Sequence, residues 1–192
     1  TNIYLLQQYY RTLIVNTEKI MRKTIILTLL AMACLAATAQ IRIPGTKAEF
    51  SLPENEWKYL ETKKVDKSTT RYLYSYAKEL VVEENGDTVL PNARIYVRKN
   101  FTGSVYDYIT DRWEEQPYQT LDEFTLDLVG VEAVGYIGAY TNPLDKKDYI
   151  FRTLYLVDRG TAMEMRLETT SDTYELFASM FETIIASLTL TR

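Results

Sequence analysis

The sequence predicts an α+β domain built on a mostly antiparallel β-sheet with helices packed on it. Short apolar runs separated by turn residues are typical of antiparallel strands. Tight hairpins are predicted at Asn85-Gly86 and at Asp158-Arg159-Gly160. Two amphipathic stretches predict helices, and each has an apolar face that must pack on another element.

The first strands are predicted on either side of a turn at Pro53-Glu54-Asn55. They cover residues 50–52 and 57–65, which are rich in apolar and aromatic side chains. The next strand is predicted over residues 71–82, where tyrosines recur at every second position.

The strand that returns from the Asn85-Gly86 hairpin is predicted over residues 88–90. Pro91 interrupts it, because proline has no backbone N–H to donate to a neighbouring strand. The strand then resumes over residues 93–99.

A first helix is predicted to begin after Ser104 and to end before Pro117. Val105, Ile109 and Trp113 recur at intervals of four residues, which places them in one apolar stripe. We expect this stripe to pack on the sheet.

The second half of the chain contains further strands. Residues 121–128 fit either a helical turn or a strand, whereas residues 131–140 and 149–158 have the apolar content of strands. The turn at residues 158–160 predicts that residues 161–168 pair with the strand before it.

The last helix has the clearest pattern in the chain. Asp172 and Glu175 have the spacing of a capping box at a helix start. A broad apolar face follows, made of Tyr174, Phe177, Phe181, Ile184, Ile185 and Leu188.

An export signal is predicted over residues 21–39. Met21-Arg22-Lys23 gives a basic start, residues 24–35 form a short apolar core, and Ala37 and Ala39 are the small residues that a signal peptidase accepts. Cleavage is expected before Gln40. The apolar core is shorter than the roughly 20 residues that a membrane-spanning helix needs.

Three segments are therefore predicted. Residues 1–20 are an upstream leader or an artefact, residues 21–39 are the signal peptide, and residues 40–192 form one domain. An alternative treats Cys34 as the acylated cysteine of a lipoprotein. Either interpretation predicts an exported protein, periplasmic or extracellular, with no stable membrane span once the signal is cleaved.

Composition excludes several classes of function. Residues 40–192 hold 18 basic and 25 acidic side chains, a net charge of −7, which argues against binding nucleic acid or anionic lipid. The chain has no histidine, and its one cysteine is Cys34. Nucleophile systems based on histidine, and the usual zinc sites, are thereby excluded.

Several segments resemble the PsbP-like family, which includes many exported bacterial proteins of unknown role. They are residues 83–93 (EENGDTVLPNA), residues 135–138 (GYIG), residues 167–170 (LETT), and the helix end at residues 184–188 (IIASL). The resemblance covers roughly residues 50–188. It implies an antiparallel sheet sandwiched between helices and a role in binding or assembly. It implies no catalytic residue, and this chain lacks the histidines by which some members of the family are proposed to hold a metal ion.

Tyrosine content suggests a candidate binding surface. Tyr72, Tyr74 and Tyr76 share one face of a strand, and tyrosine combines a large contact area with a hydroxyl group. These three are the candidate partner-binding residues. The alternative is that they are core residues lying under a helix, since tyrosine also favours strands.

Other patterns carry less chemistry. Ser75 and Lys78 have the spacing of serine acyltransfer enzymes, but on a strand an offset of three residues places them on opposite faces.

Glu83, Glu84 and Asp87 surround a hairpin tip and offer oxygen ligands for a hard cation, without the spacing of a calcium loop. Gly135 and Gly138 are interpreted as positions that allow a β-bulge or a close backbone approach.

The sequence thus predicts an exported binding or assembly protein without catalysis or cofactor, whose partner is another envelope or secreted protein. An alternative is a carrier that holds a lipid, glycan or metal ion in a cleft between sheet and helix. A third hypothesis is a hydrolase that uses carboxylates. Such an enzyme needs buried charged groups, and among the charged residues only Lys78, Glu79 and Glu132 are expected within apolar-rich strands.

Overall fold

A seven-stranded antiparallel sheet forms the centre of the fold. The computed structural model describes residues 38–191. The strand order in the sheet is β3-β4-β7-β11-β10-β9-β8. In chain order the strands are β3 (Trp57–Lys64), β4 (Thr69–Tyr76), β7 (Asn92–Lys99), β8 (Gln119–Asp127), β9 (Glu132–Thr141), β10 (Asp148–Asp158) and β11 (Thr161–Thr170).

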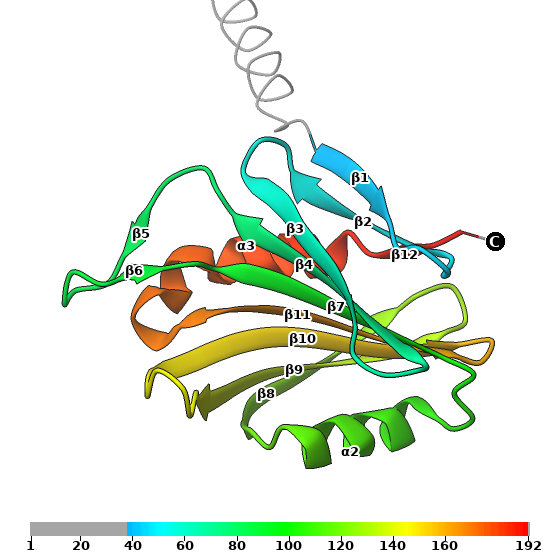
Figure 1. Ribbon diagram of the computed structural model, residues 1–192. Coiled ribbons are helices and arrows are strands. Elements are labelled where there is room, and N and C mark those ends of the chain that lie inside the picture. The colour runs from blue at the N-terminus through cyan, green and yellow to red at the C-terminus, as the bar shows by residue number, and fades with distance from the viewer. Residues whose placement is uncertain (1–37, 192) are drawn as a thin grey trace, which may run out of the picture. The chain divides into compact units, whose positions relative to one another are not determined.

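Two smaller sheets accompany it. Strands β1 (Thr38–Arg42), β2 (Ala48–Pro53) and β12 (Thr189–Leu190) form one, and β5 (Val81–Val82) pairs with β6 (Thr88–Val89) in the other. The turn at residues 53–55 therefore joins strands of two different sheets. In Figure 1 the β5–β6 hairpin extends beyond the end of the main sheet.

The two helices cover opposite faces of the main sheet (Figure 1). Helix α2 (Val105–Glu115) packs on Val134 and Tyr155, whereas α3 (Tyr174–Ala186) belongs to the larger core that contains Leu154 and Met165. Tyr155 and Leu154 are neighbours in β10, so their side chains point to opposite faces. The predicted α+β sandwich, an antiparallel sheet between helices, is confirmed.

Most predicted strands are present, but the strand predicted over residues 71–82 is not continuous. Strand β4 ends at Tyr76, and Val81–Val82 form the separate strand β5 in another sheet. Of residues 121–128, which fit either a helical turn or a strand, residues 121–127 belong to β8. The Arg159-Gly160 turn joins β10 to β11, and both residues have positive φ, as a two-residue hairpin of this hand requires. At Asn85-Gly86 the hairpin is present but its loop is longer, because the Glu83 N–H donates to the Asp87 carbonyl across three intervening residues.

Both predicted helices form, but two details of the prediction were wrong. On α2 the buried positions are Val105, Tyr108 and Arg112, whereas Trp113 is 38% exposed. Arg112 is buried on this face because its guanidinium group pairs with the buried carboxylate of Glu164. The stripe predicted through Trp113 is therefore rotated by about one residue.

The predicted capping box at Asp172 is also wrong. Residues Ser171–Thr173 form a 3₁₀ turn (η1), and α3 begins after it without a side-chain cap. The Thr173 hydroxyl is buried and lies 2.6 Å from that of Thr169 and 3.1 Å from that of Thr170. All six residues of the predicted apolar face of α3 are buried, as expected.

The predicted leader at residues 1–20, nearly all of the predicted signal peptide and Cys34 lie outside the described residues. Thr38 and Ala39 belong to β1, where they pair with Pro53 and Leu52. Cleavage before Gln40 stays a prediction, and it would remove the first two residues of this strand. Within residues 38–191, no helix is long and apolar enough to span a membrane.

Candidate functional site

Strand β11 carries three charged side chains on the face of the sheet that α2 covers. Glu164 and Glu168 are fully buried, and Arg166 is 1% exposed. They alternate with Met163, Met165 and Leu167, which point into the opposite core. Because β11 lies between β7 and β10, neither of its long sides reaches solvent.

These side chains are joined by hydrogen-bonded ion pairs. Glu164 accepts from Arg112 Nε at 2.6 Å and from Arg166 Nε at 2.8 Å, one to each carboxylate oxygen. Glu168 pairs with Arg94 Nη2 at 2.7 Å. We call this set of Arg94, Arg112, Glu164, Arg166 and Glu168 the arginine–glutamate cluster.

Positive charge exceeds negative charge in the cluster, which has three guanidinium groups and two carboxylates. Burial alone raises the pKa of Glu164, but the guanidinium groups of Arg166 and Arg112 outweigh burial and hold that pKa below its ordinary value. Arg112 also pairs with Glu115, which lies at the surface. Arg166 Nη2 has no hydrogen-bond partner among the described residues.

Aromatic rings complete the surroundings of the arginines. The guanidinium carbon of Arg166 lies 4.4 Å from the centre of the Phe151 ring and 5.8 Å from that of Tyr118. The Tyr118 and Phe151 rings meet edge to face at 4.8 Å directly over Gly138. A Cβ at Gly138 would lie 2.5 Å from Phe151 and 2.8 Å from Tyr118, so a side chain there would displace both rings.

An open hollow lies beside the cluster, between the end of α2 and the sheet. Its volume is about 720 Å³. We call it the Tyr118–Tyr140 hollow, and it is lined by residues 115–119, residues 139–141 and Pro143.

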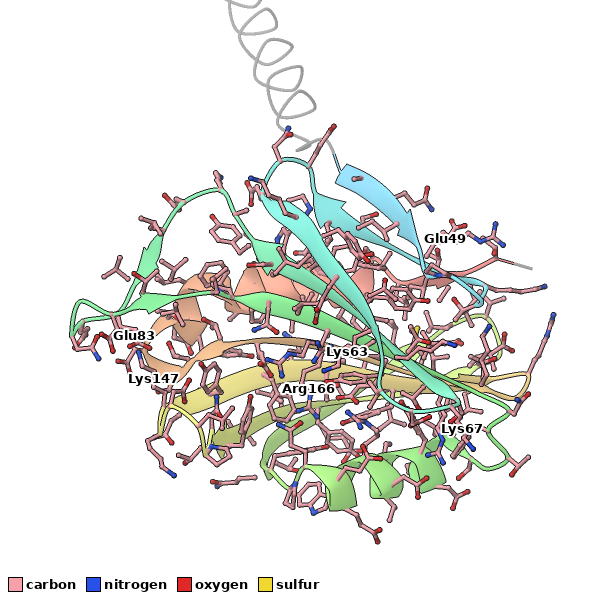
Figure 2. The ribbon with its side chains drawn as sticks, viewed as in Figure 1. Glu49, Lys63, Lys67, Glu83, Lys147 and Arg166 are labelled. Carbon is pink, nitrogen blue, oxygen red and sulfur yellow. The ribbon has the colours of Figure 1, made fainter. Side chains whose placement is uncertain are left out.

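Two side chains connect the hollow to the cluster. Gln116 Oε1 accepts from Arg166 Nη1 at 3.0 Å, and the Tyr140 hydroxyl donates to Glu168 Oε2 at 3.2 Å. Burial raises the pKa of Tyr140, and the charge of Glu168 raises it further, so the phenol stays protonated as a donor. Figure 2 shows Arg166 near the middle of the sheet, on the face turned toward the viewer. The cluster is thus adjacent to a space large enough for a small molecule.

The three tyrosines predicted to bind a partner lie on the other face of the sheet. Tyr74 is 9% exposed and Tyr76 is 6% exposed, both within the core that α3 covers, and Tyr72 is half-buried. Tyr74 meets Phe50 edge to face at 5.9 Å, and Tyr76 meets Phe177 at 4.9 Å. This placement favours the interpretation of the row as core residues, and partner binding through it stays a prediction.

Ser75 and Lys78 are not brought together. The Ser75 hydroxyl is buried and donates to the Tyr76 carbonyl, whereas Lys78 follows the end of β4 and pairs with Glu56. Ser75 and Lys78 therefore do not form the hydrogen-bonded pair that acyl transfer requires.

The acidic hairpin tip is tied to a lysine. Lys147 Nζ lies 2.6 Å from Glu83 Oε2 and 2.8 Å from Asp87 Oδ2, and Figure 2 shows Glu83 and Lys147 side by side. The Lys147 ammonium group thus lies between the two carboxylates, at the position where the sequence offers oxygen ligands to a metal cation. Across residues 38–191, no three acidic, histidine or cysteine side chains are grouped to hold a metal ion.

Sequence reasoning missed the arginine–glutamate cluster. Glu164, Arg166 and Glu168 recur at every second residue of a predicted strand, which is the pattern of a solvent-facing side. The sequence does contain arginines on the adjoining strand β7 and on α2 that could pair with these carboxylates. Whether they lie close to Glu164 and Glu168 depends on which strands pair, which the sequence does not specify. Gly135 and Gly138 are positions of close approach, as predicted; a Cβ at Gly135 would lie 2.2 Å from Phe124.

The fold was compared with known proteins. No family model matches the chain, and no curated protein matches it in sequence. A solved structure of cyanobacterial PsbP (CyanoP) from Synechocystis sp. PCC 6803 is similar, with a TM-score of 0.54 and 13% identity over 82% of this chain and 94% of that one.

A second similar structure is LpqN of Mycobacterium tuberculosis, described as involved in cell envelope biogenesis. Its TM-score is 0.51, with 13% identity over 81% of this chain and 91% of that one. The chain therefore has the PsbP-like fold, and the resemblance predicted from its sequence is confirmed at the level of the fold.

Proposed function

We propose that this protein is an exported, non-catalytic binding or assembly protein whose partner is another envelope or secreted protein. The PsbP-like fold supports this class, and one protein that shares it, LpqN, is described as involved in cell envelope biogenesis. Export rests on the predicted signal sequence.

The observation that carries the proposal is an apolar surface on the projecting β5–β6 hairpin. Leu80, Val82 and Leu90 are 79%, 53% and 61% exposed. Val81 and Val89 pair with each other and are buried, so the residues beside them face outward. Neighbouring exposed apolar side chains of this kind mark protein interaction sites.

The edges of the main sheet are less suited to a partner. The register shifts by a bulge in both edge strands, between Tyr59 and Glu61 in β3 and between Thr120 and Asp122 in β8. Lys58 and Lys63 lie on either side of the first bulge, and Asp122 and Glu123 belong to or follow the second. Bulges and charges are the devices that prevent strand addition at an edge.

The buried carboxylates support a role without catalysis. Glu164 pairs with Arg112 and Arg166, and Glu83 pairs with Lys147. These cations hold the pKa values of both carboxyls below the ordinary value, against the effect of burial. A general acid at neutral pH needs the opposite shift.

Capture from the native envelope fraction tests the proposal. A Leu80→Ser/Leu90→Ser variant is compared with Leu176→Ser, which changes an equally exposed leucine on α3. We expect the hairpin variant to lose a cross-linked partner that the wild type and Leu176→Ser both retain, with an unchanged unfolding midpoint. Equal capture by all three proteins would contradict the role of the hairpin.

The Tyr118–Tyr140 hollow favours a second candidate function, carriage of a small ligand between sheet and helix. Trp113 offers a reporter, because its ring lies 4.4 Å from that of Tyr118. In a Trp57→Phe background, the fluorescence of Trp113 should change when a ligand enters the hollow. The chain has only these two tryptophans, so the signal is unambiguous.

A further inference from the structure

We infer that the Tyr118–Tyr140 hollow binds a small organic anion, with a carboxylate or phosphate head group received by Arg166 and an apolar body against the hollow's walls. This inference rests on the second candidate function, carriage of a small ligand. It adds the chemical class of that ligand and the residue that recognises it.

The first argument is charge. Arg94 is 29% exposed and pairs with Glu168, whereas the buried Arg112 and Arg166 share the one carboxylate of Glu164. Glu115 is the additional carboxylate near Arg112. The Glu115 side chain is 59% exposed, so solvent screens it. A buried cation without a full complement of anions is costly, and an incoming anion relieves that cost.

The second argument is the set of hydrogen bonds that Arg166 makes. Its Nε donates to Glu164 and its Nη1 donates to the neutral amide oxygen of Gln116. Its Nη2 makes no hydrogen bond of ordinary geometry among residues 38–191, although the Tyr155 hydroxyl lies close to the guanidinium group. A guanidinium group is shaped to receive an oxyanion through two nitrogens. The neutral amide oxygen of Gln116 thus lies at a position where a charged oxyanion would be a stronger hydrogen-bond acceptor for Arg166.

The position of Gln116 allows this exchange. It follows the last residue of α2 as the C-cap, and it is one of the residues that line the hollow. Its side chain can swing out without breaking a helical hydrogen bond, because the helix is held there by the backbone N–H of Gln116 bonded to the Arg112 carbonyl. An oxyanion entering the hollow would then reach Nη1 of Arg166.

The walls of the hollow fit an apolar body. Pro117, Tyr118, Tyr140 and Pro143 provide rings, and Ala139 adds a methyl group. Glu115 is the only carboxylate among the lining residues, and it is already paired with Arg112. The single proton of the Tyr140 hydroxyl is donated to Glu168, so Arg166 is the donor that we assign to an oxyanion.

Titration of Trp113 fluorescence in the Trp57→Phe protein tests the inference with hexanoate, hexyl phosphate and the neutral hexanamide. We expect hexanoate or hexyl phosphate to bind at least about tenfold more tightly than hexanamide, as hydrogen bonds to a charged acceptor predict. The stronger of the two anions identifies the head group.

Two variants that add one carboxylate to the hollow locate the site. In Gln116→Glu the new carboxylate lies beside Arg166 and occupies it, so the affinity for the anion should fall about tenfold or more. Gln119→Glu adds the same charge among the lining residues, but Gln119 makes no hydrogen bond to Arg166. It should therefore weaken binding by less than about threefold, as expected for a solvent-screened charge.

The outcomes separate the inference from the function on which it rests. Equal affinity for hexanoate, hexyl phosphate and hexanamide would overturn the preference for an anion, while the carriage of a small ligand would still be supported. No fluorescence change with any of the three would overturn both. Equal weakening by Gln116→Glu and Gln119→Glu would show general repulsion and overturn the role of Arg166. Because Gln116→Glu adds an ion pair to Arg166, retained folding is expected and is checked by the unfolding midpoint.

Discussion

The two faces of strand β11 are stabilised in different ways. Met163, Met165 and Leu167 point into a core of apolar side chains shared with α3, where burial of apolar surface is non-directional. Glu164, Arg166 and Glu168 point the other way, into the arginine–glutamate cluster, where each hydrogen bond requires a particular partner atom. One strand of ten residues therefore takes part in two kinds of interior.

The difference determines how each face responds to change. Apolar cores tolerate substitutions that preserve volume, because dispersion contacts can be remade by small shifts. A charged cluster does not, because removal of one partner leaves the other buried without compensation. We therefore expect the α3 face to give stability and the α2 face to give a fixed geometry beside the hollow.

Loss of Glu164 should have the largest effect. Glu164→Ala removes the carboxylate that both Arg112 and Arg166 use, so we expect the free energy of unfolding to fall by about 5 kcal/mol, the top of the range for a broken buried ion pair. Chemical denaturation measures it. Glu114→Ala on the exposed side of α2 is the control, and a similar small loss in both variants would mean that the cluster contributes nothing.

Phe181→Ala tests the apolar face. The ring is fully buried and packs against Trp57, Tyr174 and Phe177, so its removal should cost about 3–5 kcal/mol. Phe181→Leu should recover most of that loss, because an apolar core accepts a side chain of similar volume. A loss below about 1 kcal/mol for the alanine variant would contradict the role of α3 as the cover of this core.

A smaller effect is expected from the tyrosine row. Tyr74→Ala should cost about 2–3 kcal/mol if the ring is a core residue, whereas Tyr59→Ala, its exposed cross-strand neighbour, should cost about 1 kcal/mol. The same two variants can be tested for capture of a partner from the native envelope fraction. Loss of the partner with Tyr74→Ala at an unchanged unfolding midpoint would restore the tyrosine row as the binding surface.

Mild acid should have the smallest effect. The pKa of Glu164 lies below 4.5 in the folded protein, so the unfolded chain binds this proton first as the pH falls. The stability from Glu164 is thus complete well above pH 4.5 and is lost below it, by at most about 1 kcal/mol at pH 4.

Thermal unfolding between pH 7 and pH 4 measures this loss. Glu83 and Asp87 add losses of the same sign, because Lys147 lowers their pKa values as well. The Glu164→Gln variant isolates the contribution of Glu164, since it should lose less stability over this range than the wild type. An equal loss in both would contradict the direction assigned to this carboxyl.

Local patterns predicted most of the elements correctly. The apolar face of α3, the hairpin at Arg159-Gly160 and the close approach at Gly138 each depend on residues near one another in the chain. The capping box at Asp172 failed because Thr173 found buried hydroxyl partners in Thr169 and Thr170. The stripe through Trp113 failed because Arg112 could be buried once Glu164 lay opposite it.

The sequence by itself determined the α+β class, most of the helices and strands, the charge and the absence of histidine, because these follow from composition and from the period of neighbouring residues. Tertiary structure decided which polar residues are buried. Glu164, Arg166 and Glu168 have the pattern of a surface strand, yet strand order and α2 enclose them with Arg94 and Arg112. The Tyr118–Tyr140 hollow likewise exists only where the end of α2 meets β9, since its walls come from segments that only folding brings together.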